Sequence, residues 1–449
     1  MNVCVVGLGK LGAPLAAVLA AKGHEVIGID VDAAAVAAIT HGRAPVAEPG
    51  LPEMLQRARP RLTATTDWNQ ALAAADASFV IVPTPSEEGG GFSNRLLLDA
   101  VGHIGAALRG AGRYHVVNIT STVMPGSCDG PVRAALEAAS GRKVGEGLGL
   151  CYNPEFIALG SVIRDMLRPD MILLGECDAR AGDVIEAVYR TVTENAPPVQ
   201  RMNLVNAETA KIALNAFVTM KISFANVIAE ISEALPGGDA DAVLTALGKD
   251  SRIGPKYLKG ALGYGGPCFP RDNAAIASLT RRLGTQPDLA LATDTVNRRQ
   301  AGRLAVRVAR HLPPGGAVAI LGLAYKPHTP VVEESQGLML AADLAARGVA
   351  VTAYDPLALA NARAVLGKSV RYAAGLEEAV ADAAVIVIAT PDPAFRGLPA
   401  LLERRGGHPI VFDCWRLLTG LPVPARVIGL GQGMPAAIEE ALSPCGPAI

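Results

Sequence analysis

The stretch NVCVVGLGKLG, Asn2 to Gly12, decides the fold of the first part of the chain. A short β-branched run leads into three glycines with the spacing Gly-x-Gly-x-x-Gly, and an alanine-rich segment follows them. Gly7 permits a tight turn, Gly9 lets a ligand approach the backbone, and Gly12 lets a helix pack on the strand. The stretch therefore predicts a strand, a glycine turn and a helix whose free N–H groups point at a phosphate.

The acidic residue at the end of the next predicted strand indicates which dinucleotide the turn binds. GHEVIGID, Gly23 to Asp30, has the pattern of a second strand, and it ends in a carboxylate. A carboxylate at this place accepts hydrogen bonds from an adenosine ribose diol and repels a 2′-phosphate, so the pattern favours NAD over NADP. The predicted cofactor is NAD, and its first binding residues are Gly7, Gly9, Lys10, Leu11, Gly12 and Asp30.

The second half of the chain repeats the strand pattern of the first. The segments 317–327, 348–356 and 381–391 match the stretches around Asn2, Gly23 and Ala75 in the same order. Continuous apolar strands that alternate with helices are typical of a parallel sheet covered on both faces. The predicted class is α/β, with two Rossmann-like, doubly wound parallel-sheet domains. Only the first keeps the glycine fingerprint, so the second is expected to bind something other than a dinucleotide.

A long helix is predicted between the two repeats. Residues 204–235 contain no proline or glycine, and the sequence Pro-Gly-Gly ends the run. Apolar residues occur on nearly every side, and one subunit can hardly cover so long a helix, so we expect it to pack against a second subunit. The predicted domains are 1–200 for NAD, 201–300 as a helical dimerisation domain, and 301–449 as the second Rossmann-like domain.

Composition excludes several classes of protein. The formal net charge is −1, which gives no reason to expect a nucleic-acid or membrane-surface partner. No continuous apolar run approaches the length of a membrane span, and the start lacks a leader pattern, so a cytoplasmic location is expected. Seven scattered cysteines include no Cys-x-x-Cys pair, which argues against disulfides and against a metal site.

One cysteine has unusual neighbours. Cys268 lies in GYGGPCFPRD, Gly263 to Asp272, where glycines allow close backbone approach and prolines stiffen the loop. Arg271 and Lys259 are near in sequence, and a cation lowers a thiol pKa. Asp272 is a candidate base. The alternative is an inert cysteine in a loop, which is the commoner case for such a residue taken alone.

Two more groups are candidates for chemistry. Lys211 and Asn215 are four residues apart and share a face of the long helix, where they can stabilise an oxyanion or simply make helix contacts. Glu155, in Asn153-Pro154-Glu155-Phe156, is either an acid–base group or the cap of the next helix. Capping is the more common role of such a residue.

Seven stretches together resemble the UDP-glucose/GDP-mannose dehydrogenase family over nearly the whole chain. They are GLGKLG, IVPTP, TSTVMPGS, NPEFIALGSVIRD, AETAKIALNAFVTMKISFANVIAEI, SRIGPKYLKGALGYGGPCFPRD and GLAYKP. The resemblance implies oxidation of the C6 alcohol of a nucleotide sugar to a carboxylate, with NAD as the electron acceptor. It also implies a homodimer through the central helix, catalytic residues in the domain 201–300 and a nucleotide-sugar site in the domain 301–449. A cysteine thiohemiacetal and then a thioester carry the second oxidation, and water releases the acid.

The resemblance also assigns roles to residues. Cys268 is the nucleophile, Lys211 and Asn215 hold the oxyanions, and Asp272 with Thr122 and Glu155 positions or activates water. Pro83, Thr84, Ser121 and Thr122 lie along NAD. The implied substrate residues are Glu155, Phe156, Ile157, Leu159, Lys211, Asn215, Arg252 (from the partner subunit), Tyr257, Lys259, Gly265 and Lys326.

The chain departs from the family pattern in three places, near the sugar and the domain junction. Leu159 replaces a second glutamate, which leaves Lys326 without its usual acid. Glu333 stands where an arginine is common, and Asp413-Cys414-Trp415-Arg416 replaces Asp-Gly-Arg. Because the residues assigned to the reaction are intact, these departures bear on the identity of the sugar and leave the reaction unchanged.

The leading hypothesis is a UDP-sugar 6-dehydrogenase, with UDP-glucose as the first substrate to test. UDP-N-acetylhexosamine and GDP-mannose remain open. A dehydrogenase of β-hydroxy acids also joins a Rossmann domain to a long helix with a lysine and an asparagine, but it needs no cysteine. A protein that binds NAD without catalysis is the third alternative.

Overall fold

The computed structural model describes residues 1–157 and 159–433, and the chain divides into two compact units, Met1–Ala213 and Leu214–Ile449. Of the seven cysteines counted above, Cys445 lies outside the described ranges. The first unit contains an eight-stranded sheet in the order β3-β2-β1-β4-β5-β6-β7-β8. Its strands are β1 (Asn2–Val6), β2 (Glu25–Ile29), β3 (Leu62–Thr65), β4 (Ala77–Val80), β5 (His115–Ile119), β6 (Leu148–Tyr152), β7 (Ile172–Glu176) and β8 (Val199–Asn203).

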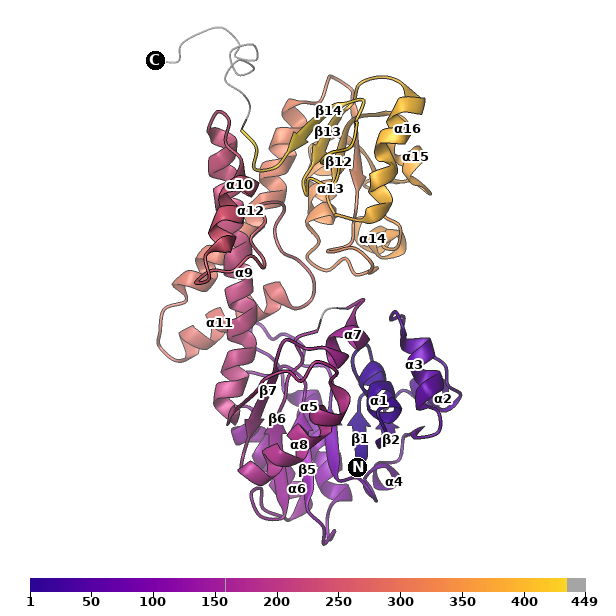
Figure 1. Ribbon diagram of the computed structural model, residues 1–449, viewed down its shortest axis with the longest axis vertical. Helices are drawn as coiled ribbons and strands as arrows, with labels where there is room; N and C mark the ends of the chain where they lie inside the picture. Colours follow the sequence, from indigo (N-terminus) through magenta and orange to yellow (C-terminus); the bar gives the residue numbers. More distant parts are fainter. Residues whose placement is uncertain (158, 434–449) are drawn as a thin grey trace. The chain divides into compact units, whose positions relative to one another are not determined.

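Helices cover both faces of this sheet (Figure 1). They are α1 (Gly12–Ala21), α2 (Ala33–Thr40), α3 (Leu51–Ala58), α4 (Trp68–Leu72), α5 (Arg95–Ala107), the π-helical turn η1 (Cys128–Val132), α6 (Arg133–Ser140), α7 (Val162–Leu167) and α8 (Ala179–Val192). All pairings are parallel except that of β6 with β7, which is antiparallel. The sheet is therefore mixed at one end, and the predicted α/β class is confirmed.

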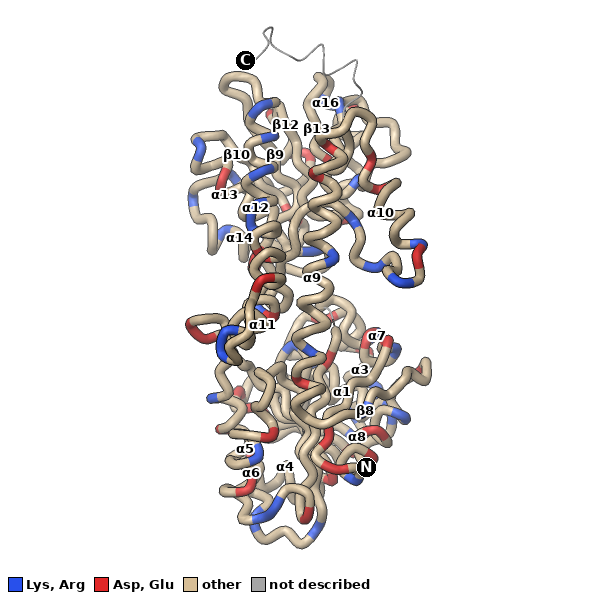
Figure 2. Tube along the Cα trace, turned by 90° about the vertical axis from the view of Figure 1, so that its left-hand side faces the viewer, with Lys and Arg blue, Asp and Glu red and all other residues tan. Residues whose placement is uncertain are grey.

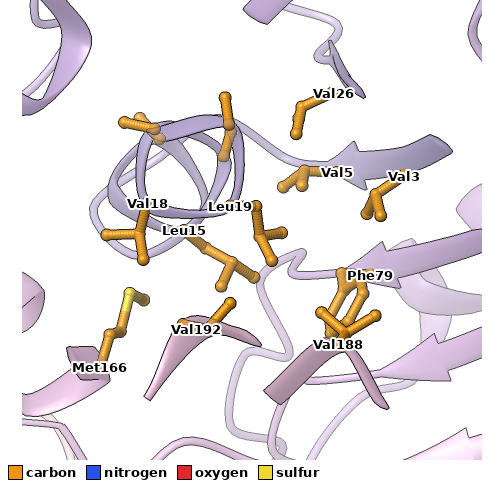
Figure 3. Close-up of a cluster of buried hydrophobic side chains, with 14 of the residues drawn as sticks. Val3, Val5, Leu15, Val18, Leu19, Val26, Phe79, Met166, Val188 and Val192 are labelled. Atoms are coloured by element: carbon orange, nitrogen blue, oxygen red, sulfur yellow. The ribbon is translucent and has the colours of Figure 1, made fainter. Parts of the chain in front are cut away.

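Alternate residues of β1 enter two separate cores. Val3 and Val5 pack with α1 and α8 on one face, whereas Cys4 and Val6 pack with α5 on the other. Figure 3 shows the first core, where Leu15 and Leu19 of α1 lie beside the β1 valines. A strand whose successive side chains are all buried must be covered on both faces, which is why its sequence shows no alternation of apolar and polar residues.

The second unit contains a six-stranded, wholly parallel sheet in the order β11-β10-β9-β12-β13-β14. Its strands are β9 (Ala317–Leu321), β10 (Ala350–Tyr354), β11 (Arg371–Tyr372), β12 (Ala383–Ile388), β13 (Ile410–Asp413) and β14 (Arg426–Gly429). Its helices are α10 (Ala240–Lys249), α11 (Phe269–Arg282), α12 (Asp288–Arg310), α13 (Gln336–Ala346), α14 (Leu359–Leu366), α15 (Leu376–Val380), the 3-10 turn η2 (Pro393–Gly397) and α16 (Leu398–Arg405).

The internal repeat is confirmed strand by strand. β10, β9 and β12 are neighbours in the second sheet, as β2, β1 and β4 are in the first. Gly322, with φ of 101°, follows β9 as Gly7, with φ of 93°, follows β1. A Cβ on Gly337 would lie 2.2 Å from the Gly322 carbonyl oxygen, which gives this glycine of α13 the helix-packing role of Gly12. This role cannot be read from the sequence pattern because a long loop separates the two glycines.

The long helix is α9 (Leu204–Ala234), close to the predicted 204–235. Charged positions are sparse along it (Figure 2). Its length and composition are those of a membrane span, with mean hydropathy of 1.6 over its most apolar window, 44% of which is buried. Polar residues interrupt every apolar run in this helix, so the expectation of no continuous run of span length holds, but alanine and other apolar residues still give a high average. Buried Glu208, Ser223 and Asn226 each bond within their own unit, as in the core helix of a globular protein.

A buried histidine makes the stability of the first unit depend on pH. His115 of β5 is fully buried, and its Nε2 and Nδ1 lie 2.8 Å from the Ser78 hydroxyl and the Ala75 carbonyl oxygen. Burial lowers its pKa from 6.5 to about 4, with Arg113 and Arg142 acting in the same direction. Below pH 6.5 the unfolded chain therefore binds a proton at His115, whereas the folded chain binds it only when the pH approaches about 4.

We expect the free energy of unfolding to fall as the pH drops from 6.5 toward 4, by about 3 kcal/mol for this group. Urea denaturation of wild type and His115→Gln over this range measures the effect, and the variant should have the flatter profile. His41→Gln, at an exposed site of the same unit, serves as the control. Equal slopes for wild type and His115→Gln would contradict the expectation.

Candidate functional site

The glycine turn of the first unit has the geometry that a pyrophosphate needs. A Cβ on Gly12 would lie 1.7 Å from the Gly7 carbonyl oxygen, so α1 approaches the turn too closely for any side chain. A Cβ on Gly9, by contrast, would have no heavy atom of the described residues within 4 Å. The side of Gly9 is therefore open to a ligand. The turn lies between the carboxyl ends of β1 and β4, where the strand order reverses and α/β sheets bind ligands.

Asp30 is placed at the end of β2 beside this turn. Its carboxylate accepts the N–H of Leu8 at 2.6 Å and the N–H of Asp32 at 2.9 Å. A carboxylate has about four acceptor positions, so two remain for a ribose diol. The two backbone bonds fix the carboxylate against the glycine turn.

The ends of β4 and β5 bring together the other residues assigned to NAD. The Ser121 hydroxyl accepts the N–H of Val82 at 2.8 Å and donates to the Val82 carbonyl at 2.7 Å. The Thr84 hydroxyl donates to the Thr122 carbonyl at 2.6 Å. Pro83 is exposed between them. The glycine turn, Asp30 and the ends of β4 and β5 thus lie along one edge of the first sheet, and this edge fits a dinucleotide.

Gly9 offers a clean test of this edge. Gly9→Ala is expected to weaken NAD binding at least about 10-fold while leaving the melting temperature unchanged, because the added methyl meets only the space for phosphate. Titration calorimetry with NAD measures the affinity. Gly102→Ala, in α5 and equally free of neighbours among the described residues, should bind NAD as wild type does. Equal affinities in the two variants would argue against a phosphate beside Gly9.

Glu155 does not cap a helix. The next helix, α7, begins at Val162 with Ser161 before it, so the capping interpretation was wrong. The Glu155 carboxylate instead accepts the Tyr189 hydroxyl at 2.8 Å, and its carbonyl accepts Lys211 Nζ at 2.5 Å. Burial raises the pKa of Glu155, opposed by the Tyr189 bond and by Lys211.

Lys211 also lies 4.5 Å from the centre of the Phe156 ring. The first unit therefore brings together three predicted site residues, Glu155, Phe156 and Lys211, while Ile157 and Leu159 pack against its core.

Two buried glutamates support this region and were missed in the sequence. Glu48 accepts the N–H groups of Gly160 and Val162 at 2.9 and 2.8 Å, and so fixes the end of the segment that carries Glu155. Glu208 accepts the N–H groups of Gly126 and Cys128 at 2.6 and 2.7 Å. Glu208 could have been found in the sequence, because it is a charged residue in an otherwise apolar helix, three residues before Lys211. Glu48 gave none, because its partners are more than a hundred residues away.

The second unit places Cys268 at the surface. Among the six cysteines within residues 1–157 and 159–433, Cys268 alone is exposed. It is the residue before α11, where the helix dipole favours an anion. A Cβ on Gly265 would lie 2.2 Å from the Glu334 carbonyl oxygen, and one on Gly266 would lie 2.6 Å from the Tyr325 ring. Close packing therefore explains both glycines.

Asn215 and Asp272 meet in the same unit. Asn215 Nδ2 donates to Asp272 Oδ2 at 2.6 Å, and both side chains are buried. Burial lowers the pKa of the neighbouring Arg271, while Asp272 and Cys268 act to raise it. A cation, Arg271, and an anion, Asp272, thus follow the cysteine within about one helical turn. Lys211 precedes Asn215 by one turn of α9, so this helix carries residues of both sets.

The remaining predicted substrate residues are more exposed. Arg252 pairs with Asp250 at 2.6 Å, and its side chain is 85% exposed. Tyr257, with φ of 64°, and Lys259 are also exposed, whereas Lys326 is partly buried beside the Tyr325 ring. The exposure leaves Arg252 and Lys259 accessible to a ligand or to a partner subunit.

Three residues at the departures from the family pattern make contacts within the second unit. The Glu333 side chain is exposed, and its carbonyl accepts the Gly266 N–H at 2.9 Å. Trp415 Nε1 donates to the Ala389 carbonyl at 2.8 Å. Arg416, with φ of 55°, pairs with Asp241 of α10 and donates to the Gly260 carbonyl at 3.0 Å.

Comparisons with known proteins show the family of the chain. Sequence models of the UDP-glucose/GDP-mannose dehydrogenase family match in three parts: the NAD binding domain at residues 1–193, the central domain at 205–299 and the UDP binding domain at 319–420. A UDP-glucose 6-dehydrogenase of Haloferax volcanii is 37% identical, over 93% of this chain and 97% of its own. A GDP-mannose 6-dehydrogenase of Pseudomonas putida is 32% identical, over 89% and 93%.

A solved structure supports the fold over most of the chain. The UDP-glucose dehydrogenase of Pyrobaculum islandicum has a TM-score of 0.86 and 36% identity, and the match covers 96% of this chain and 98% of that one. The two parallel-sheet units and the long helix α9 are thus the fold of a known family. The chain belongs to the UDP-glucose/GDP-mannose dehydrogenase family, and it carries that family's NAD binding and UDP binding domains.

Proposed function

We propose that this protein is an NAD-dependent UDP-sugar 6-dehydrogenase that converts the C6 alcohol to a carboxylate, with UDP-glucose as the first substrate to test. The observation that carries the proposal is Cys268, exposed in its glycine loop beside the buried pair Asn215 and Asp272. An alcohol dehydrogenase that stops at the carbonyl has no use for such a nucleophile. Relatives that act on UDP-glucose support the choice of sugar.

NAD, when bound at the first sheet, supplies the hydride acceptor for both oxidations. After the first oxidation, the Cys268 sulfur adds to the aldehyde carbon; a C–S bond forms, and the electron pair of the C=O bond moves to oxygen. Lys211 and Asn215 hold that oxygen while it is charged. When the C–H bond of this adduct loses its hydride, a thioester is left.

Water then completes the reaction. It attacks the thioester carbon, the C–S bond breaks, and Cys268 regains its electron pair as the carboxylate is released. Asp272, with Thr122 and Glu155, positions the water and takes its proton. Each oxidation removes two electrons, so two NADH form for each sugar, and one water oxygen enters the acid.

The substrate residues and the three-part organisation are kept as proposals. The nucleotide is assigned to the last domain, 301–449, and the central domain, 201–300, carries Cys268 and Asp272. The three separately matched family domains support these divisions. Phe156, Ile157, Leu159, Tyr257, Lys259, Gly265 and Lys326 are proposed to line the nucleotide sugar. A cytoplasmic location also stays a prediction.

A panel of nucleotide sugars tests the function. NADH formation is measured with UDP-glucose, UDP-N-acetylglucosamine, UDP-N-acetylgalactosamine and GDP-mannose, and the sugar product is identified by mass spectrometry. We expect the highest kcat/KM with UDP-glucose and two NADH for each acid. A higher value with another sugar would replace the substrate and keep the reaction. No turnover with any of them would reject the proposed function.

We further propose that the chain forms a homodimer through α9. Phe217, Phe224 and Ile231 recur every seventh residue on this helix and are 59%, 48% and 50% exposed. Such a stripe on a helix is covered in solution by a second apolar surface. The charged residues of α9 are few, namely Glu208, Lys211, Lys221, Glu230 and Glu233, and none of them belongs to this stripe.

The dimer gives a prediction of its own. Phe224→Glu places a charge at the middle of the stripe and is expected to shift the protein to monomer in analytical ultracentrifugation. Leu289→Glu, at an exposed leucine of α12, is the control and should sediment as wild type does. If Arg252 serves the partner's substrate, the monomer should also lose activity. An unchanged sedimentation coefficient for Phe224→Glu would place the interface elsewhere.

A further inference from the structure

The backbone before Cys268 is held by two buried asparagines that no role discussed so far explains. The segment is Ala261–Tyr264, which leads into the loop of Gly265, Gly266 and Pro267. One asparagine comes from α9 and the other from α12, so two separate helices reach the same four residues. Both asparagines and the segment belong to the second unit.

Asn226 of α9 holds the start of the segment. Its Oδ1 accepts the N–H of Ala261 at 2.9 Å, and its Nδ2 donates to the Leu262 carbonyl at 3.3 Å. The side chain is 1% exposed. An amide that both accepts from and donates to the backbone imitates a neighbouring strand, so it fixes position and direction together.

Asn297 of α12 holds the end of the segment in the same way. Its Oδ1 accepts the N–H of Tyr264 at 2.7 Å, and its Nδ2 donates to the Tyr264 carbonyl at 3.0 Å. The side chain is 4% exposed. A Cβ on Gly263 would lie 2.3 Å from this Oδ1, so any side chain at this position would clash with the Asn297 amide.

The loop is fixed again just before the cysteine. The N–H of Gly266 donates to the Glu333 carbonyl at 2.9 Å, and the Tyr325 ring leaves no space for a side chain there. The backbone is thus held at Ala261–Tyr264 and at Gly266 before the exposed Pro267 and Cys268, and α11 holds it again because the Cys268 carbonyl accepts the Asp272 N–H at 2.8 Å. A reacting atom whose backbone is held on both sides has little freedom of direction.

These amides are not needed to attach their helices. α12 is bound to α9 by Arg299 and Gln300, which contact Glu230, and by Arg303, which pairs with Glu233. A buried amide is costly unless its bonds serve a purpose. The four bonds of Asn226 and Asn297 all go to the cysteine segment, so their purpose lies there.

We propose that Asn226 and Asn297 are paired positioning residues that clamp Ala261–Tyr264 and set the direction in which Cys268 meets the aldehyde. This inference rests on the proposed function, because it assigns Cys268 as the nucleophile. The clamp matters chiefly for the second oxidation, since only that step needs the sulfur at bonding distance from carbon.

The test compares Asn297→Ala and Asn226→Ala with Gln300→Ala, a control at a buried amide of α12 whose bonds go to Glu230 and Val296. We expect the two asparagine variants to lose about 10- to 100-fold in kcat for acid formation, with KM for the nucleotide sugar within about 2-fold of wild type. Aldehyde trapped with hydroxylamine should increase, because the first oxidation continues. The control should match wild type in all three measurements.

Two further measurements, the kinetics of Asn297→Asp and the chemical labelling of Cys268, test the clamp even if an alanine variant folds poorly. Asn297→Asp keeps the acceptor for the Tyr264 N–H, and it should recover part of the lost kcat even if the alanine variant folds poorly. The rate at which iodoacetamide labels Cys268, followed by mass spectrometry without substrate, should change at least about 3-fold in the asparagine variants only. Wild-type kcat and wild-type labelling rates in these variants would overturn the clamp.

Failure of the proposed function is distinguishable from failure of the clamp. If wild type turns over no nucleotide sugar, the function is rejected, and the labelling rates still report whether the asparagines orient the thiol. If wild type is active and the asparagine variants behave as Gln300→Ala does, the function stands and the clamp is wrong.

Discussion

Cys268→Ala is expected to reduce acid formation by about 10³-fold or more, because no other group of the proposed site can form the thioester. The first oxidation does not need sulfur, so a slow release of aldehyde with one NADH for each sugar is the most that should remain. Product analysis by mass spectrometry together with NADH absorbance separates the two oxidations.

Cys177→Ala is the matched control. Cys177 is half-buried in the first unit, where its thiol donates to Asp178 at 2.9 Å and its sulfur accepts the Leu150 N–H at 3.2 Å. This variant should keep wild-type kcat. Acid formation by Cys268→Ala within about 10-fold of wild type would remove the covalent mechanism and would favour a β-hydroxy-acid type of chemistry.

Lys211→Met should have the second-largest effect, a loss of about 10²- to 10³-fold in kcat, because a cation aimed at a developing oxyanion is removed. The same change also breaks the 2.5 Å bond from Nζ to the Glu155 carbonyl, so KM for the nucleotide sugar should rise as well. Steady-state kinetics at several sugar concentrations separate the two effects.

Two further variants test this interpretation: Lys211→Arg is the conservative replacement, and Lys22→Met is the control. The arginine keeps the charge with another shape and should recover part of kcat. Lys22 forms a surface ion pair with Glu194 at 3.0 Å, and its replacement should leave the kinetics unchanged. A Lys211→Met enzyme with raised KM and wild-type kcat would show that the lysine only holds the substrate segment.

Much of this protein could be predicted from short patterns. The glycine turn, Asp30, the repeated strands and α9 followed from residues within a few positions of one another. Positive φ at Gly7, continuous apolar strands and a run without glycine or proline are decided by neighbours along the chain. The residues proposed for chemistry were found by family motifs, because spacing alone left inert alternatives for Cys268 and Glu155.

What sequence patterns determined was therefore local: which segments form strands, where the backbone turns, and which of the two sheets keeps a dinucleotide fingerprint. Tertiary structure decided the partners of buried polar groups. Glu48 meets Gly160 across 112 positions, Asn226 meets Ala261 across 35 and Asn297 meets Tyr264 across 33. A buried donor or acceptor must find a partner wherever packing brings one, and that meeting depends on the whole fold.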